Sequence, residues 1–521
     1  MPESCYRGTL RPRNRVPEQS LPLIVSDIRL LTAADYCQLQ ASVNSDALDA
    51  PFLLWYRFPL GYEQFIRPES GNPFIPALLL PAMRAGEPLE LPAPVSPRLL
   101  RATKLIQGIY HAWDPSLYQV AIQAPIIESD GLEVTQARET ALFVSLGLDS
   151  LYSLMKNVHE HPEDGETISH LIHVLGFDIR VRNEHNATLD AIRGNVHKLG
   201  DRFNKTVVCA ATNLRDIMDR FVDWSLLGHG AGLASVGLSL EALFENVHIA
   251  AGPTYADPKP CGSHPILDPL WSTERQSFFY DGAEATRLEK AKFVAQFPAA
   301  LETLRVCFRD PPQAYNCGRC WKCLSTMIRL DIAGALQDCP TLPQHVDVEN
   351  VRRVQLEPEL RPSVYKRILD EVQAADGDVE LQAALGRLVD EALAREPGSL
   401  AEIYHLQTQV VHLGPLRAEL ARLQGLLEEQ TAWALRSVGE VAVRDALIRR
   451  LQAERDEQAA WALRSAEAVA ERDALIVALR DQLRATSGGA VGPGSSRPSA
   501  LPSLYRRACG WLAGRLRTLN E

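Results

Sequence analysis

Long apolar runs are missing from this chain. No stretch reaches the roughly 18 consecutive apolar residues that a membrane-spanning helix requires. The N-terminus, which reads Met-Pro-Glu-Ser-Cys-Tyr-Arg-Gly, contains no apolar core of a signal peptide. We therefore expect a cytoplasmic protein without a membrane span or a secretion signal.

The chain also lacks an excess of basic residues. It has 54 Lys and Arg against 65 Asp and Glu, which gives a net charge of -11 at pH 7. A general nucleic-acid-binding protein needs a basic surface, so the composition argues against that class. A hydrophobic fraction of 46% and a charged fraction of 23% are typical of globular proteins. Because 521 residues exceed a single hydrophobic core, we expect two or three domains.

Cysteine is scarce, and four of the ten cysteines share one spacing pattern. The pattern Cys307-x9-Cys317-x2-Cys320-x2-Cys323 can close on one point and supply the four thiolates of a tetrahedral Zn²⁺ site. A disulfide cluster and unrelated buried thiols are the alternatives, and the missing secretion signal argues against disulfides. Four thiolates leave no open position on the metal, so such a zinc ion would be structural.

A strand, a polar turn and a helix follow one another between residues 141 and 155. Residues 141–144 are apolar, 145–150 are rich in Ser, Gly and Asp, and apolar residues then recur at helical spacing. Such a layout turns backbone N–H groups and a helix N-terminus toward an anion. Hydroxyls in the turn can donate to phosphate, and its carboxylate can hold Mg²⁺. An ordinary strand-to-helix turn with Ser and Asp as caps is the alternative.

This turn resembles the pyrophosphate loop of the PP-loop ATP-pyrophosphatase superfamily, whose pattern is Ser-Gly-Gly-x-Asp-Ser. The matching residues are Ser145, Gly147, Asp149 and Ser150, whereas Leu146 replaces the first glycine. Glycine lets such a loop adopt positive φ and approach phosphate closely. The leucine therefore either hinders ATP or is tolerated by the local geometry.

Together with the late cysteine pattern, residues 138–335 are similar to the 7-cyano-7-deazaguanine synthases, a PP-loop family with a late zinc knuckle. The resemblance implies bound ATP, Mg²⁺ and Zn²⁺. It also implies that a small-molecule or glycan-linked substrate is adenylated with release of pyrophosphate, followed by amidation or ligation. The alternative is a catalytically inactive PP-loop scaffold that oligomerises and recruits partners through a coiled coil.

The strand pattern predicts an α/β fold. Near-continuous apolar strands separated by helical segments indicate a doubly wound parallel sheet over residues 138–345. An α+β domain over residues 21–130 would precede it, after a disordered segment at 1–20. The expected parallel strands lie near residues 140–145, 168–175, 205–211 and 246–251.

Several polar residues follow these strands, where ligands of parallel sheets bind. Asp178 either contacts a ribose or caps a turn. His229 and Gly230 open a helix, so they either meet a phosphate or pack the helix. On the later helix that contains Arg287 and Lys290, Lys290 could face the nucleotide, and the other charges are expected to be solvated.

A long loop follows the fourth strand at residues 252–275, and such loops are usually functional or disordered. Lys259 and His264 in this loop are candidate catalytic residues beside Asp149 and Ser150. The resemblance implies that the loop handles substrate and phosphate. The alternative is a surface loop stiffened by its prolines.

The C-terminal third differs in pattern from the rest. Apolar residues at heptad spacing form a coiled-coil seam, and a segment around Trp433 recurs around Trp461 after 28 residues, or four heptads. The seam predicts a homo-oligomer, and similar repeats in glycan-assembly proteins suggest a glycan-precursor substrate. The basic amphipathic tail either contacts a membrane peripherally, docks as a helix or frays. The expected parts are a helical segment at 346–413, the coiled coil at 416–485, a linker at 486–500 and the tail at 501–521.

Overall fold

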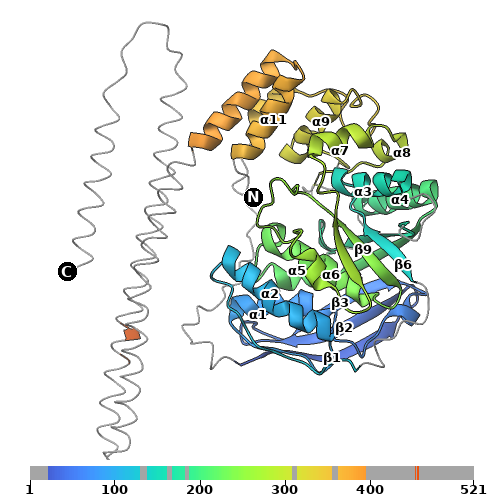
Figure 1. Cartoon of the computed structure of the whole chain (residues 1–521), viewed down its shortest axis with the longest axis vertical. Coiled ribbons are helices and arrows are strands. Elements are labelled where there is room, and N and C mark those ends of the chain that lie inside the picture. The colour runs from blue at the N-terminus through green and yellow to red at the C-terminus, as the bar shows by residue number, and fades with distance from the viewer. Residues whose placement is uncertain are drawn as a thin grey trace, which may run out of the picture. The chain divides into compact units, whose positions relative to one another are not determined.

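A ten-stranded, mostly parallel sheet runs through the first of the chain's two units, residues 1–399 (Figure 1). The computed structural model describes residues 21–128, 138–160, 167–181, 187–307, 314–354 and 362–394, and Gln452, Arg455 and Asp456 of the second unit. The expected disordered N-terminus, linker and tail, and nearly all of the expected coiled coil, lie outside the described residues. No helix in the described ranges is long and apolar enough to cross a membrane.

Five strands form the parallel part of the sheet in the order β10-β9-β6-β7-β8. This confirms the predicted α/β class with a parallel sheet, and β10 is a strand that the sequence pattern missed. The first of the five, β6, lies in the middle, and the chain runs outward from it first on one side and then on the other. Dinucleotide-binding folds share this order, and their ligands bind where the direction reverses, here between β6 and β9. The strands are β6 (Glu139–Phe143), β7 (His170–Leu175), β8 (Thr206–Thr212), β9 (Phe244–Ala250) and β10 (Ser277–Asp281).

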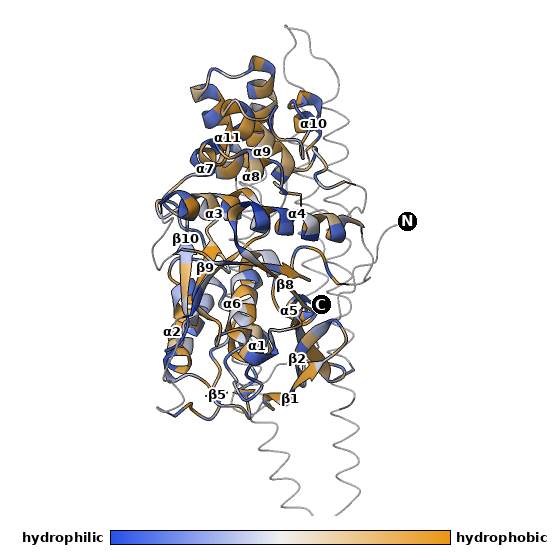
Figure 2. Ribbon diagram, turned by 90° about the vertical axis from the view of Figure 1, so that its right-hand side faces the viewer, coloured by the Kyte–Doolittle hydropathy of each residue, from blue (hydrophilic) through white to orange (hydrophobic). Residues whose placement is uncertain are grey.

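Helices cover both faces of this parallel part (Figures 1 and 2). Because neighbouring side chains of a strand point to opposite faces, Ala141 and Phe143 of β6 join one apolar cluster and Leu142 joins another. The first cluster includes helices α1, α5 and α6, and the second includes α3 and α4. Their bounds are α1 (Phe74–Ala85), α3 (Leu148–Glu160), α4 (Ala187–Phe203), α5 (Leu214–Met218) and α6 (His229–Ser239).

The strands of residues 21–128 continue the same sheet. β3 pairs with β8 in antiparallel register, so the boundary expected near residue 130 falls within one sheet. Side chains at the end of β8 bind the backbone of β3. Thr212 Oγ1 donates to Trp55 O over 2.7 Å, and Asn213 Oδ1 accepts from Trp55 N over 2.9 Å. This strand end is therefore used to join the two parts of the sheet. The five strands are β1 (Leu23–Thr32), β2 (Tyr36–Asn44), β3 (Phe52–Pro59), β4 (Leu89–Glu90) and β5 (Ile122–Gln123).

Proline occurs in both helices of this N-terminal part. α2 (Pro97–Trp113) begins with proline, which needs no hydrogen-bond partner for its nitrogen there, and Ser96 caps the helix by accepting a bond of 3.0 Å from Leu99 N. The apolar run at 74–83, in contrast, forms α1 with Pro81 inside it. Tertiary burial of nearly the whole helix explains why the proline is accommodated.

A layer of short helices follows β10. Trp321 of α9 packs on Tyr365 of α11 with ring centroids 4.6 Å apart, and both belong to one buried cluster. The expected helical segment after residue 345 therefore packs on α9. The elements are α7 (Arg287–Val294), α8 (Pro298–Leu301), α9 (Trp321–Ile332), α10 (Val348–Arg353), α11 (Pro362–Ala374) and a helix over 379–394, with single turns at η2 (Glu63–Phe65), η4 (Trp224–Gly228) and η5 (Asp268–Trp271).

Candidate functional site

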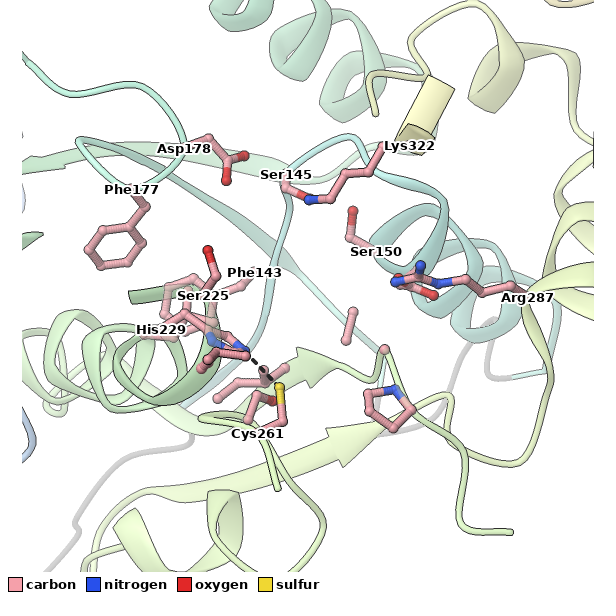
Figure 3. A pocket seen from close by; sticks show the side chains of 18 of the residues that line it. Phe143, Ser145, Ser150, Phe177, Asp178, Ser225, His229, Cys261, Arg287 and Lys322 are labelled. Atoms are coloured by element: carbon pink, nitrogen blue, oxygen red, sulfur yellow. Dashed lines mark hydrogen bonds and ion pairs between the residues drawn. The ribbon is translucent and has the colours of Figure 1, made fainter. Parts of the chain in front are cut away.

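A cavity of about 960 Å³ opens at the carboxyl ends of β6, β7 and β9 (Figure 3). It lies at the position where the strand order reverses, which is where open α/β sheets bind their ligands. Residues from the start of α3, η4, the loop after β9, α7, α9 and α11 complete its wall. The volume is near the upper end of the range for small-molecule sites, so it can accommodate a nucleotide with a second reactant.

The loop between β6 and α3 forms one side of this cavity. Leu146 has a φ of 62°, in the left-handed region that favours glycine. Its side chain is fully buried in the cluster under α3 and is not among the residues that line the cavity. Left-handed backbone costs roughly 1–2 kcal/mol in a non-glycine residue, and burying a leucine contributes about 1.5–3 kcal/mol. The backbone of the loop therefore has the left-handed conformation that a glycine would adopt at this position. The Leu146 side chain does not fill the cavity.

The two serines of the loop have different surroundings. Ser145 is exposed on the cavity wall, and its Oγ accepts a long bond of 3.3 Å from Gly147 N. Ser150 is 3% exposed, and its Oγ donates to Gly147 O over 3.0 Å. Ser145 can therefore reach a ligand, while Ser150 mainly holds the loop to the first turn of α3.

Asp149 forms two ion pairs with α7. Its Oδ2 lies 3.1 Å from Arg287 Nη2 and its Oδ1 lies 3.1 Å from Lys290 Nζ. Burial alone would raise the pKa of Asp149, but the two cations outweigh burial and lower it. Lys290 is fully buried and also donates to Ala251 O over 2.5 Å, so it binds within the protein. Each carboxylate oxygen faces a cation of α7, and Asp149 itself lines the cavity.

Two cationic side chains remain on the cavity wall beside this loop. Arg287 keeps 47% of its side chain exposed, and the amino group of Lys322 lies near Ser145 in Figure 3. Sequence analysis missed Lys322 because it stands between two of the expected zinc ligands. Adjacent residues at the start of a helix point in different directions. A residue between two metal ligands can therefore face a cavity while the ligands face the metal.

Aromatic and acidic side chains also line the cavity. Asp178 follows β7, is exposed and lines the wall. Phe177 beside it packs on Trp224 of η4 with ring centroids 4.6 Å apart, and both rings line the cavity. The turn needs Gly176, because its φ is 105° and a Cβ there would lie 2.0 Å from Thr212 O. No local pattern pointed to Trp224.

The two residues expected at the start of α6 separate in the structure. His229 lines the cavity, and its Nδ1 lies 3.3 Å from Trp224 O. Gly230 instead faces the loop after β9, where an added Cβ would lie 2.0 Å from Gly262 O. It is not part of the cavity wall, so the structure gives it the packing role and not the phosphate contact.

The loop after β9 divides into a cavity-lining half and a buried half. Lys259 lines the cavity and pairs with Asp257 over 3.4 Å. His264 is 7% exposed and packs edge-on against Trp113 with ring centroids 5.1 Å apart. It is absent from the cavity wall, so the structure does not place it as a catalytic residue. The loop folds back here because Asp268 is fully buried and accepts a bond of 3.1 Å from His264 N.

The four cysteines of the spacing pattern meet at one point, as predicted. Their sulfur atoms lie within 4.8 Å of one another, and Cys317 Sγ and Cys323 Sγ are 3.8 Å apart. Zn–S bonds of about 2.3 Å in a tetrahedron give sulfur–sulfur distances of about 3.8 Å. Hydrogen bonds from neighbouring thiols lower the pKa of Cys307, and Cys307 in turn raises the pKa of Cys320 and Cys323. Four thiolates so close together require a cation, so the cluster could hold a metal such as zinc.

Surrounding groups hold these ligands in place. Asn316 Oδ1 accepts from Val306 N over 2.9 Å and from Cys307 N over 3.2 Å. Cys320 N donates to Cys317 Sγ over 3.3 Å, a bond that stabilises a thiolate. Cys320 is also the residue before the first turn of α9, so the cluster lies at the start of the helix that carries Lys322.

The cavity thus combines a strand–loop–helix turn, several cationic side chains that include Arg287 and Lys322, and an aromatic pair, with a metal-compatible cluster beside it. Comparison of the chain with protein-family models, with curated proteins and with solved structures gave no match.

Proposed function

We propose that this chain is a PP-loop type enzyme that uses ATP to adenylate a substrate and then transfers the activated group to a nitrogen nucleophile. The observation that carries the proposal is the position of the loop of residues 145–150. It lies at the carboxyl end of the central strand, where the strand order reverses, and it borders a cavity whose wall includes the exposed cations of Arg287 and Lys322. An ordinary strand-to-helix turn that binds no ligand would require neither a place at the point of strand reversal nor cationic side chains around it.

The phosphates of ATP would lie on the side of the cavity formed by Ser145, Arg287 and Lys322. A hydroxyl and two cationic donors offer charge-assisted hydrogen bonds to phosphate oxygens. Asp149 is assigned a supporting role, because its ion pairs hold Arg287 at the loop. Mg²⁺ would enter with ATP as part of the substrate.

The nucleoside would lie beside Asp178 and the aromatic pair. Asp178 follows the strand next to the central one, the position at which an acidic residue of dinucleotide-binding folds contacts a ribose hydroxyl. Phe177 and Trp224 offer an apolar aromatic surface to a base or to a ring of the second substrate.

In the reaction, a carboxylate or carbonyl oxygen of the substrate attacks the α-phosphorus of ATP. The bond from that phosphorus to the bridging oxygen breaks, and pyrophosphate leaves with the electron pair. A nitrogen nucleophile then forms a bond to the activated carbon, and AMP leaves. Arg287 and Lys322 would stabilise the charge on the leaving pyrophosphate. The proposed substrate is a small molecule or a glycan precursor. The proposed coiled coil would join copies of the chain into a homo-oligomer.

The four-cysteine cluster fits zinc and would act structurally. A bound zinc ion would join the segment of Cys307 to the start of α9. That link would keep Lys322 at the cavity.

The inactive-scaffold alternative assumed that the Leu146 side chain closes the loop to ATP. That side chain lies in the core, so the main argument for the alternative no longer applies. The scaffold alternative now predicts only that Mg-ATP does not bind.

Calorimetric titration of zinc-loaded protein with Mg-ATP tests the proposal. Lys322→Gln removes a cation whose residue is exposed, so the fold should tolerate the change. We expect the variant to bind Mg-ATP about 10- to 100-fold more weakly, which corresponds to a lost charge-assisted hydrogen bond. Lys198→Gln is the matched control, because Lys198 pairs with Glu302 outside the cavity wall.

Binding by the wild type that Lys322→Gln weakens and Lys198→Gln does not would support the nucleotide site. Release of pyrophosphate on addition of candidate carboxylates would then identify the substrate. Absence of Mg-ATP binding by folded, zinc-loaded protein would reject the proposal.

A further inference from the structure

A cysteine and a histidine meet in the wall of the cavity (Figure 3). Cys261 Sγ lies 3.9 Å from His229 Nε2, and His229 Nδ1 lies 3.3 Å from Trp224 O. A carbonyl oxygen can only accept, so Nδ1 carries the proton and Nε2 is free to accept one from the thiol. A nucleophile, a base and a group that orients the base are the parts of a nucleophilic catalytic site.

Close backbone packing holds this pair in place. Gly262 N donates to Leu226 O over 2.7 Å. A Cβ on Gly262 would lie 2.4 Å from Leu227 O, so the loop lies directly against the start of α6. The next residue, Ser263, donates from its Oγ to the buried Asp268 over 2.6 Å. The two residues that follow the thiol are therefore anchored.

The surroundings keep both groups neutral at rest. Burial raises the pKa of the Cys261 thiol and lowers the pKa of the His229 imidazole. Attack by the sulfur therefore requires transfer of its proton to Nε2, for which the histidine is already in the correct tautomer.

A second cysteine–histidine contact provides a comparison within the molecule. Cys209 Sγ lies 3.8 Å from His197 Nε2, and both Cys209 and Cys261 are partly exposed. Among the described residues, Cys261 is the cysteine that lines the cavity, whereas Cys209 does not. The two cysteine–histidine pairs have similar sulfur–nitrogen distances and differ mainly in whether they line the cavity.

We propose that Cys261 is a catalytic nucleophile that takes the activated acyl group from the adenylate as a thioester, with His229 as its base. The inference rests on the proposed function and deepens it. The sulfur forms a bond to the carbonyl carbon, and its proton moves to His229 Nε2. The bond from that carbon to the phosphate oxygen breaks, and AMP leaves with the electron pair. His229 then releases that proton to solvent. The nitrogen nucleophile attacks the thioester, its proton passes to His229 Nε2 and from there to the sulfur, and the sulfur leaves as the thiol.

Acetyl adenylate is a probe of this step that does not depend on the native substrate. Zinc-loaded protein is incubated with acetyl adenylate, digested and mapped by mass spectrometry for hydroxylamine-sensitive acetyl groups. We expect acetylation of Cys261 at least about tenfold faster than of Cys209 in the same molecule. His229→Gln should slow acetylation of Cys261 about 100-fold, the lower end of general-base contributions. Cys209→Ser should leave it unchanged.

Preferential acetylation of Cys261 that depends on His229 would support the inference. Equal acetylation of Cys261 and Cys209, or none at either, would overturn it, and this comparison needs only the wild-type protein. Mg-ATP titration reports on the proposed function separately. Binding of Mg-ATP without acetylation of Cys261 rejects the thioester alone, and absence of Mg-ATP binding rejects the proposed function.

Discussion

The backbone N–H of Arg305 donates a hydrogen bond of 2.9 Å to the carbonyl oxygen of Leu146. Leu146 lies in the loop between β6 and α3, and Arg305 lies two residues before Cys307 of the four-cysteine cluster. The bond joins the two sequence features from which the functional proposal began. Loop and cluster are therefore parts of one structural unit, although they lie far apart in the chain.

Loss of the metal should weaken nucleotide binding through this link. We expect the wild type to contain one zinc ion per chain and Cys320→Ser to lose it. Because Cys320 begins the helix that carries Lys322, the variant should bind Mg-ATP at least about tenfold more weakly. Metal analysis and calorimetric titration measure the two effects. Cys209→Ser should retain both zinc and Mg-ATP binding, and zinc loss without weaker Mg-ATP binding would contradict the link.

Replacing Leu146 by glycine should destabilise the protein without blocking nucleotide binding. Glycine relieves roughly 1–2 kcal/mol of left-handed strain, but loss of the buried side chain costs about 2–5 kcal/mol. We expect a net loss of about 1–3 kcal/mol in the free energy of unfolding, measured by denaturant titration. Leu105→Ala, on the exposed side of α2, should change it by less than about 0.5 kcal/mol. Stability equal to the wild type would mean that the burial of Leu146 contributes little.

Asp178 should distinguish ATP from 2′-deoxy-ATP. If its carboxylate accepts a hydrogen bond from the ribose 2′-hydroxyl, Asp178→Ala should weaken ATP binding about 10- to 100-fold. Binding of 2′-deoxy-ATP should change much less, because that ligand lacks the donor. Calorimetric titration with both nucleotides gives the comparison, and Asp190→Ala on the exposed side of α4 is the control. An equal loss with both nucleotides would assign Asp178 a role other than ribose recognition.

Stability should depend on pH through Asp268. Burial raises its pKa from 3.8 to about 7 in the folded protein. Between these values the folded state binds more protons than the unfolded state, so the free energy of unfolding falls as pH rises. The contribution of Asp268 to the free energy of unfolding is fully present below its pKa in the unfolded chain. It decreases by at most about 1.4 kcal/mol per pH unit and is lost above its pKa in the folded protein.

Asp268→Asn should remove this part of the pH dependence. Denaturant titrations at several pH values between the two pKa values measure the slope for the variant and the wild type. Asp190→Asn should leave the slope unchanged, because that side chain is largely exposed. Identical slopes for wild type and Asp268→Asn would show that Asp268 is ionised throughout this range.

Features that depend on local patterning could be predicted from the sequence. The four expected strands near residues 140, 170, 206 and 246 are present, because buried parallel strands require continuous apolar runs. The four cysteines meet because short spacings limit where their sulfur atoms can go. The helix α1 was not among the expected elements, because Pro81 stands inside it and the core that buries it is built from distant segments.

The two candidates in the long loop have different positions. Lys259 lies on the cavity wall, but His264 packs against Trp113. Residue type alone identified both as candidates. Their positions depend on where the loop folds back, which is set by its contacts with α2 and α6.

The sequence by itself determined the strand, loop and helix around Ser145 and the cysteine cluster, because apolar period, turn residues and ligand spacing are properties of short segments. Only the tertiary structure decided which charges meet, since Asp149 forms ion pairs with Arg287 and Lys290. It brought Lys322 and Ser145 to the wall of one cavity. It also decided that Cys261 faces His229 in the cavity. These contacts join segments far apart in the chain, and they form only when sheet order and helix packing bring the segments together.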